Sequence, residues 1–279
     1  MKTRIISGVV AGALLIGALI LSERYAVVLN IVIALIAALA SYEICGATGV
    51  RRHVFIPVIS ACMAAALPFA PMLADSALPF AETAVYTYLL LLFAHQLFHH
   101  REAAIPDVAV TALVSVFGSA ALTAIVRIRD AGGAQHGMFL LVLALLAAWS
   151  SDSGAYFAGV LLGKHKLCPE ISPKKTVEGF VGGIVGCMIV LELTAAVYCR
   201  WIAPGMQLHW MLLALIAACC SVISVVGDLT FSLIKRHYGI KDYGNIMPGH
   251  GGALDRFDSV IFVAPFFALI IQYFPIFCA

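Results

Sequence analysis

Residues 211–226 read MLLALIAACCSVISVV, a run without a single charged side chain. Extended to about 20 residues, such a run is long enough to cross the hydrocarbon core of a bilayer as a helix. The rest of the chain has the same character, because 62% of its 279 residues are hydrophobic and only 11% are charged. A soluble domain carries about 25% charged residues. The composition therefore predicts an integral membrane protein and excludes a soluble globular one.

The chain contains roughly nine such segments, which predicts an all-α, polytopic bundle of roughly nine transmembrane helices. The expected spans are 5–21, 26–47, 54–74, 84–98, 108–126, 138–163, 179–199, 209–234 and 259–278. Residues 1–137 are mostly apolar spans with short loops, and we expect them to provide scaffold and lipid access. Residues 138–279 add two polar stretches, 164–178 and 235–258, and we expect this half to be catalytic.

Basic residues gather on one side of this arrangement. With nine spans, the N-terminus and the even loops contain 13 of the 17 Lys and Arg residues, and the other side contains Arg24, Arg127, Arg129 and Arg200. Lys and Arg are enriched in cytoplasmic loops. We therefore expect a multi-pass protein of the inner (cytoplasmic) membrane. Its N-terminus and long loops would lie in the cytoplasm and its C-terminus outside.

Asp152 interrupts an otherwise apolar helix. Tyr156, Gly159 and Gly163 follow at spacings that place them on the same helical face. A buried carboxylate needs a cation or a basic side chain, which predicts a binding residue, although a hydrogen bond between packed helices is an alternative. Glycines four residues apart, here and in 179–186, predict close helix packing.

The stretch SPKKTVEG, residues 172–179, joins two lysines to the start of a helix. Thr176 is the expected N-cap. Free N–H groups at a helix start, with the ammonium groups of Lys174 and Lys175, suit a polyphosphate ligand. Paired lysines also serve as anchors at a cytoplasmic membrane surface, and that alternative stays open.

The second polar stretch carries most of the remaining charge. Asp228 and Lys235 share one helical face, and Asp255 and Asp258 are three residues apart at the start of the last span. Carboxylates converging from two helices form an oxygen site suited to Mg²⁺. The alternative is a salt bridge from Asp255 or Asp258 to Lys235.

Two ordered blocks of the C-terminal half resemble the phosphatidate cytidylyltransferase family. The first consists of DSGAY at 152–156 and SPKKTVEG at 172–179; the second consists of SLIKR at 232–236, KD at 241–242, PGHGG at 248–252 and DRFD at 255–258. The N-terminal half is similar to the family only in being hydrophobic.

The resemblance implies Mg²⁺-dependent transfer of CMP from CTP to phosphatidic acid, in which a lipid phosphate oxygen attacks the α-phosphorus and pyrophosphate leaves. His250 would donate a hydrogen bond to a phosphate. The expected partners are CTP, phosphatidic acid and the lipid bilayer, without nucleic acid; a homodimer and a second cation stay open. The expected catalytic residues are Asp228, Lys235, Arg236, His250, Asp255, Arg256 and Asp258, with Asp228, Asp255 and Asp258 as metal ligands. The expected substrate-binding residues are Asp152, Ser172, Lys174, Lys175, Thr176, Glu178, Lys241 and Asp242.

Two other functions are compatible with parts of this pattern. A CTP-dependent kinase of a lipid alcohol such as a polyprenol would need the same membrane, nucleotide and metal, but the run from His250 to Asp258 argues against it. An ion-coupled transporter would concentrate charge at the membrane midplane within repeated halves. Here the charge gathers at one face, and no repeat is evident.

Overall fold

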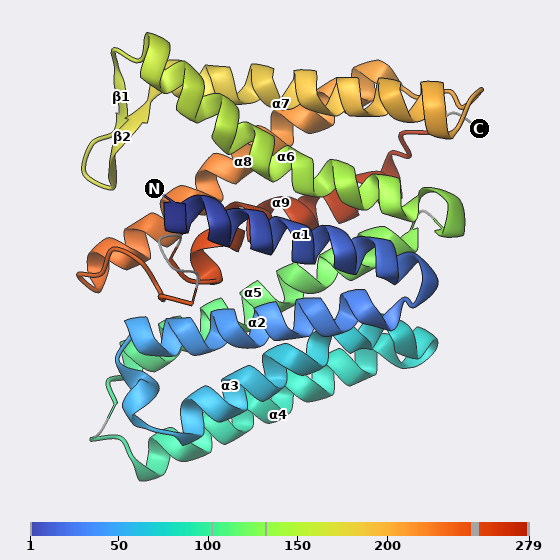
Figure 1. The fold of residues 1–279 in the computed structure, drawn as a ribbon. Helices are drawn as coiled ribbons and strands as arrows, with labels where there is room; N and C mark the ends of the chain where they lie inside the picture. The colour runs from blue at the N-terminus through green and yellow to red at the C-terminus, as the bar shows by residue number, and fades with distance from the viewer. Residues whose placement is uncertain (1, 102, 132, 247–250, 278–279) are drawn as a thin grey trace. The chain divides into compact units, whose positions relative to one another are not determined.

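The computed structural model describes residues 2–101, 103–131, 133–246 and 251–277. Helices dominate this part, in agreement with the expected all-α class (Figure 1). The α-helices are α1 (Lys2–Arg24), α2 (Val27–Ala47), α3 (Phe55–Ala66), α4 (Ala77–Phe98), α5 (Ile105–Ala131), α6 (Gly133–Leu162), α7 (Val177–Val197), α8 (Trp210–His237) and α9 (Leu254–Tyr273). The other elements are the antiparallel strands β1 (Lys166–Cys168) and β2 (Ser172–Thr176) and the short helices η1 (Val50–Arg52), η2 (Leu67–Ser76) and η3 (Tyr198–Ile202).

The number of membrane spans differs from the expectation. Within the described residues, six segments are long and apolar enough to cross a membrane: Val27–Ala47, Phe55–Phe98, Ile105–Ala131, His136–Leu162, Val177–Ile202 and Trp210–His237. The count of nine is therefore not confirmed. Helices α3 and α4 fall in one segment, and α1 and α9 are not among the six. These apolar helices are those of a multi-pass membrane protein.

The expected span 54–74 is not one α-helix. Helix α3 ends at Ala66, and the tighter helix η2 follows, with Pro68 and Pro71 inside it. Proline lacks the N–H that an α-helix needs and clashes with the preceding turn, which explains the change. Ala74 then leaves helical geometry with a φ of 46°.

The chain folds as two compact units, one formed by Met1–Arg127 and His237–Phe257, the other by Ile128–Arg236 and Asp258–Ala279. The segment between α8 and α9 thus belongs to the first unit, although both helices lie largely in the second.

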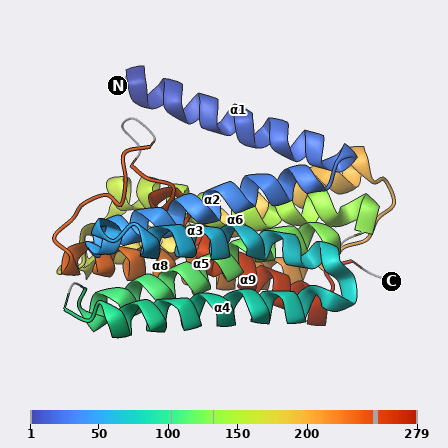
Figure 2. The same cartoon turned by 90° about the horizontal axis from the view of Figure 1, so that it is seen from below.

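In the first unit, apolar side chains of α2 to α5 form a buried core that includes Ile56, Met63, Tyr88 and Leu92. Buried hydroxyl pairs join the helices as well: Ser60 to Tyr88 at 3.0 Å, and Thr48 to Thr111 at 2.8 Å. Helix α1 joins α2 at a tight turn and diverges from it toward its own first residues (Figure 2).

In the second unit, α6 and α7 pack along their length, and the β1–β2 hairpin connects them. Helix α8 is tied to α6 by a buried hydrogen bond of 2.7 Å between Ser151 and Ser221. This pairing sets the polar residues of α6, α8 and α9 near one another, as described next.

Candidate active site

Helices α6 and α7 approach each other through their glycines, as the spacing predicted. A side-chain carbon on Gly154 would lie 2.9 Å from the Gly182 carbonyl oxygen, and one on Gly183 would lie 2.9 Å from the Ser151 carbonyl oxygen. Both distances are too short for a real carbon, so only glycine allows this approach. The start of α7 is thereby held beside α6, where Gly159 faces Thr176.

Thr176 is the N-cap of α7, which confirms the expectation. Its Oγ1 accepts the N–H of Gly179 at 3.1 Å. Glu178, in the first turn, accepts the backbone N–H of Lys164 at 3.0 Å and lies 2.6 Å from Nδ1 of His165. Both side chains thus stabilise the junction of the hairpin with α7. Their binding of substrate stays a prediction.

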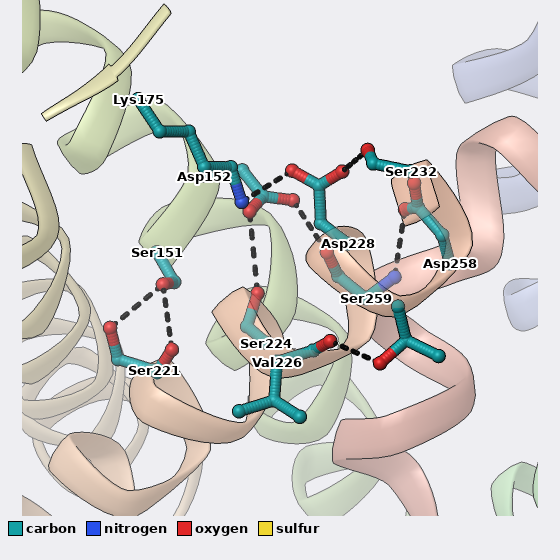
Figure 3. A network of polar contacts seen from close by, with 11 residues as sticks. Ser151, Asp152, Lys175, Ser221, Ser224, Val226, Asp228, Ser232, Asp258 and Ser259 are labelled. Atoms are coloured by element: carbon teal, nitrogen blue, oxygen red, sulfur yellow. Dashed lines mark hydrogen bonds and ion pairs between the residues drawn. The ribbon is translucent and has the colours of Figure 1, made fainter. Parts of the chain in front are cut away.

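The carboxylate of Asp152 joins α6 to two other helices. Ser224 on α8 donates to its Oδ1 at 3.3 Å, and Ser259 on α9 donates to its Oδ2 at 3.0 Å (Figure 3). Asp152 was predicted from the sequence as a binding residue, whereas neither serine was. Ser259 follows Asp258 directly, and this adjacency was the only signal available.

Asp228, on α8, is the partner of a lysine from the hairpin. Its Oδ2 lies 2.6 Å from Nζ of Lys175, and its Oδ1 accepts a hydrogen bond from Ser232 at 3.2 Å (Figure 3). Lys175 also acts electrostatically on the carboxylate of Asp152. The ammonium group of Lys175 therefore interacts with the carboxylates of both Asp228 and Asp152.

Asp258 completes this group of acids. Its Oδ1 accepts the N–H of Ser259 at 2.8 Å. The helices meet closely here, since a side-chain carbon on Gly227 would lie 2.9 Å from the Asp258 carbonyl oxygen. The Asp258 carboxylate is repelled by those of Asp228 and Asp152 and attracted by Lys235.

The acids of the second unit fit a hard cation by their chemistry. Asp152, Asp228 and Asp258 provide carboxylate oxygens, the ligands that Mg²⁺ prefers, and serine hydroxyls surround them. Three negative groups outnumber the nearby lysines, and a cation would offset this excess. Within the described residues, however, no group of three or more His, Cys, Asp or Glu side chains is arranged so that it could hold a metal ion as it stands.

The basic residues of the second unit differ in exposure. Lys174 and Arg236 are exposed, whereas Lys175, Lys235 and Ser172 are half-buried. Arg236 donates from Nε to the carbonyl oxygen of Ile171 at 3.4 Å, so α8 contacts the hairpin turn.

Four further predicted residues lie in the first unit. Oδ2 of Asp255 accepts the backbone N–H groups of Tyr243 at 2.8 Å and Gly252 at 3.0 Å. Lys241, Asp242 and Arg256 are exposed. The assignment of Asp255 to a metal stays a prediction, and His250 lies outside the described residues.

The amino-acid sequence was compared with known protein families and with curated proteins. The family model described as "Cytidylyltransferase family" matches residues 2–274. The chain is 48% identical over 140 residues to a phosphatidate cytidylyltransferase of Bacillus subtilis (strain 168), an alignment that covers 50% of each protein.

Staphylococcal proteins with the same description are also similar. The protein of Staphylococcus saprophyticus (strain ATCC 15305) is 44% identical over 137 residues, and that of Staphylococcus aureus (strain COL) is 42% identical over 137 residues. Each alignment covers 49% of this chain and 50% of the relative. The chain thus spans about half the length of the curated relatives that it matches.

Proposed function

Because the chain belongs to the cytidylyltransferase family, we propose that it transfers CMP from CTP to phosphatidic acid, giving CDP-diacylglycerol and pyrophosphate. The observation that carries this proposal is the gathering of Asp152, Asp228 and Asp258 in one unit, with Lys175 acting on the first two and Lys235 on Asp258. The relatives described as phosphatidate cytidylyltransferases support the choice of lipid.

The reaction requires little proton transfer. A phosphate oxygen of phosphatidic acid is already anionic when it attacks the α-phosphorus of CTP, so no strong base is needed. The bond between the α-phosphorus and its bridging oxygen to the β-phosphorus breaks, and pyrophosphate leaves. The protein must align the two phosphates and offset their charge.

The residues of the second unit can meet these demands. Lys174, Lys175, Lys235 and Arg236 would bind phosphate oxygens as charged donors. Asp228 and Asp258 would hold Mg²⁺, with Asp152 as the third carboxylate of this unit. Bound there, Mg²⁺ would neutralise negative charge on the nucleotide phosphates. Further polar groups for binding substrate or metal would come from the segment before α9 and from the first turn of that helix. These are the side chains of Lys241, Asp242, His250, Asp255 and Arg256.

The setting in the membrane follows from the substrates. We propose an inner-membrane location with the N-terminus in the cytoplasm, so that the acyl chains of phosphatidic acid stay in the bilayer while its head group meets CTP. The apolar helices and the cytoplasmic placement expected for basic residues support this.

A labelling experiment distinguishes this function from a lipid kinase. Purified full-length protein in detergent is incubated with Mg²⁺, phosphatidic acid, a polyprenol and CTP carrying ³²P in either the α or the γ position. We expect the α label in CDP-diacylglycerol and the γ label in pyrophosphate. Transfer of the γ label to a polyprenol, with release of CDP, would favour the kinase. Lipid without either label, in the presence of folded protein, would contradict both functions.

A further inference from the structure

Glu43 makes a long-range contact within the first unit that the proposed chemistry does not use. It lies on α2, inside an expected membrane span, and is only 4% exposed. Its Oε1 accepts the backbone N–H of Ala253 at 2.9 Å, and its Oε2 accepts that of Leu254 at 2.8 Å. Both oxygens of one buried carboxylate are thus bonded to the start of α9.

This contact replaces an ordinary helix cap. The first N–H groups of a helix have no partner within the helix, and a Ser, Thr, Asp or Asn side chain just before it usually accepts one of them. Here Ala253 precedes α9 and has no side-chain oxygen. A carboxylate from a distant helix takes that place, and its negative charge also complements the positive end of the helix dipole.

The surrounding loop is built closely around the Glu43 carboxylate. A side-chain carbon added to Gly244 or Gly252 would collide with it. The loop is anchored a second time by Asp255, which accepts the N–H groups of Tyr243 and Gly252. The described residues of the loop on either side, 243–244 and 252–253, therefore lie close to the carboxylate.

A third anchor holds the beginning of the same segment. The hydroxyl of Tyr238 donates to Oδ1 of Asp107, on α5, at 3.0 Å. Burial and the Asp107 carboxylate raise the pKa of Tyr238 to about 12. A tyrosine hydroxyl is protonated at neutral pH in any case, and the raised pKa extends its role as donor into the basic range.

The residues held in this way are those expected to act on substrate. Lys241 and Asp242 lie on the anchored loop, and Asp255, Arg256 and Asp258 lie within the first five residues of α9. We propose that Glu43 is a positioning residue that fixes the loop and the first turn of α9 for cytidylyl transfer, an inference that rests on the proposed function. Helix α2 would then contribute directly to the geometry of this segment, beyond scaffold and lipid access.

The test combines activity with amide hydrogen exchange in the full-length protein. Glu43→Ala removes both acceptors, and Glu43→Gln leaves one carbonyl oxygen for two N–H groups. Gly252→Ala displaces the carboxylate without changing any charge. Glu82→Gln is the matched control, because Glu82 is an exposed carboxylate on α4 of the same unit.

We expect faster exchange in the peptide 251–257 for all three test variants and no change for the control. Because a loosened first turn of α9 spends less time in the geometry required for transfer, kcat of the folded protein should fall about 10-fold for Glu43→Gln. The loss should be larger for Glu43→Ala, which gives a graded rescue from Ala through Gln to Glu.

Two results separate this inference from the proposed function. If the melting temperature falls while kcat of the folded fraction and the exchange of 251–257 stay as in the unchanged protein, Glu43 is merely structural and the inference is overturned. If exchange increases as expected but the unchanged protein makes no CDP-diacylglycerol, the cap is supported and the proposed function fails.

Discussion

The carboxylate of Asp152 is held by two serine hydroxyls within a helix whose composition is that of a membrane span. Asp228 and Asp258 repel it, and Lys175 partly offsets the charges of Asp152 and Asp228. Charges away from water are costly unless they are paired. The protein retains this excess of negative charge in one place, which indicates a binding role rather than a contribution to stability.

Replacing one of these acids should therefore separate activity from folding. Asp258→Asn keeps the size of the side chain and an acceptor for the Ser259 N–H but removes one charge. We expect a loss of transfer of about 100-fold or more, because several kcal/mol of charge stabilisation are lost. The melting temperature without Mg²⁺ should stay unchanged or rise, because like-charge repulsion is reduced. The measurements are CDP-diacylglycerol formation at saturating Mg²⁺ and thermal unfolding in detergent.

The same substitution at an exposed acid controls for the chemical change. Asp75 is exposed on η2 of the first unit, and Asp75→Asn should leave transfer unaltered. Near-normal turnover of Asp258→Asn would contradict a metal-binding role. Asp258 would then be better explained as the salt-bridge partner of Lys235.

The pairing of α6 with α7 depends on small residues along both helices. Glycines at 154, 159, 179, 182, 183 and 186 all stand where a side chain would meet the opposing helix. This contact keeps β2, and with it Lys175, beside α6. The active-site geometry thus depends on how closely two spans can approach.

Gly154→Ala should disrupt that approach. Its added carbon would lie 2.9 Å from the Gly182 carbonyl oxygen, so the backbones must separate. Overpacking of this kind costs about 1–3 kcal/mol, and we expect a lower unfolding midpoint in detergent together with reduced transfer. Gly17→Ala on α1 is the control, because its added carbon meets nothing within 4 Å.

The control should be neutral or stabilising by up to about 1 kcal/mol, since alanine favours a helix over glycine. Equal unfolding midpoints for the two variants would show that the α6–α7 contact tolerates a wider spacing than its glycines indicate.

The chain as a whole has many apolar helices and two compact units, but its orientation in the membrane stays a proposal. An odd number of crossings puts the termini on opposite sides, and an even number puts them on the same side. The six candidate segments include the 44-residue stretch Phe55–Phe98, which contains two α-helices. The number of crossings is therefore best measured directly.

We expect Lys174 and Lys241 to face the cytoplasm and Ala279 to lie outside, because basic residues are retained on the cytoplasmic side. Single cysteines at these positions, in a background without the eight native cysteines, are labelled in cells with an impermeant maleimide before and after permeabilisation. Labelling of positions 174 and 241 from opposite sides would contradict a single active site. Labelling of position 279 only after permeabilisation would indicate an even number of crossings.

Several features could be predicted from the sequence because their causes are local. Apolar runs indicate helices in a membrane, Thr176 caps the helix that it precedes, and glycines four residues apart share one face. Hydropathy, capping and helical spacing each act within a few residues, so a single sequence contains the whole signal. The predicted number of spans was not confirmed. Prolines and charged residues at helix starts interrupt the apolar runs, so the runs alone do not define where each span begins and ends.

Other features depended on the tertiary structure. Asp152 meets Ser224 and Ser259 across 72 and 107 residues, and Glu43 reaches Ala253 across 210 residues. No periodicity or spacing relates such distant positions. Which buried carboxylate accepts which N–H or hydroxyl is decided by helix packing, because a polar group away from water must find its partner among the groups that packing places beside it.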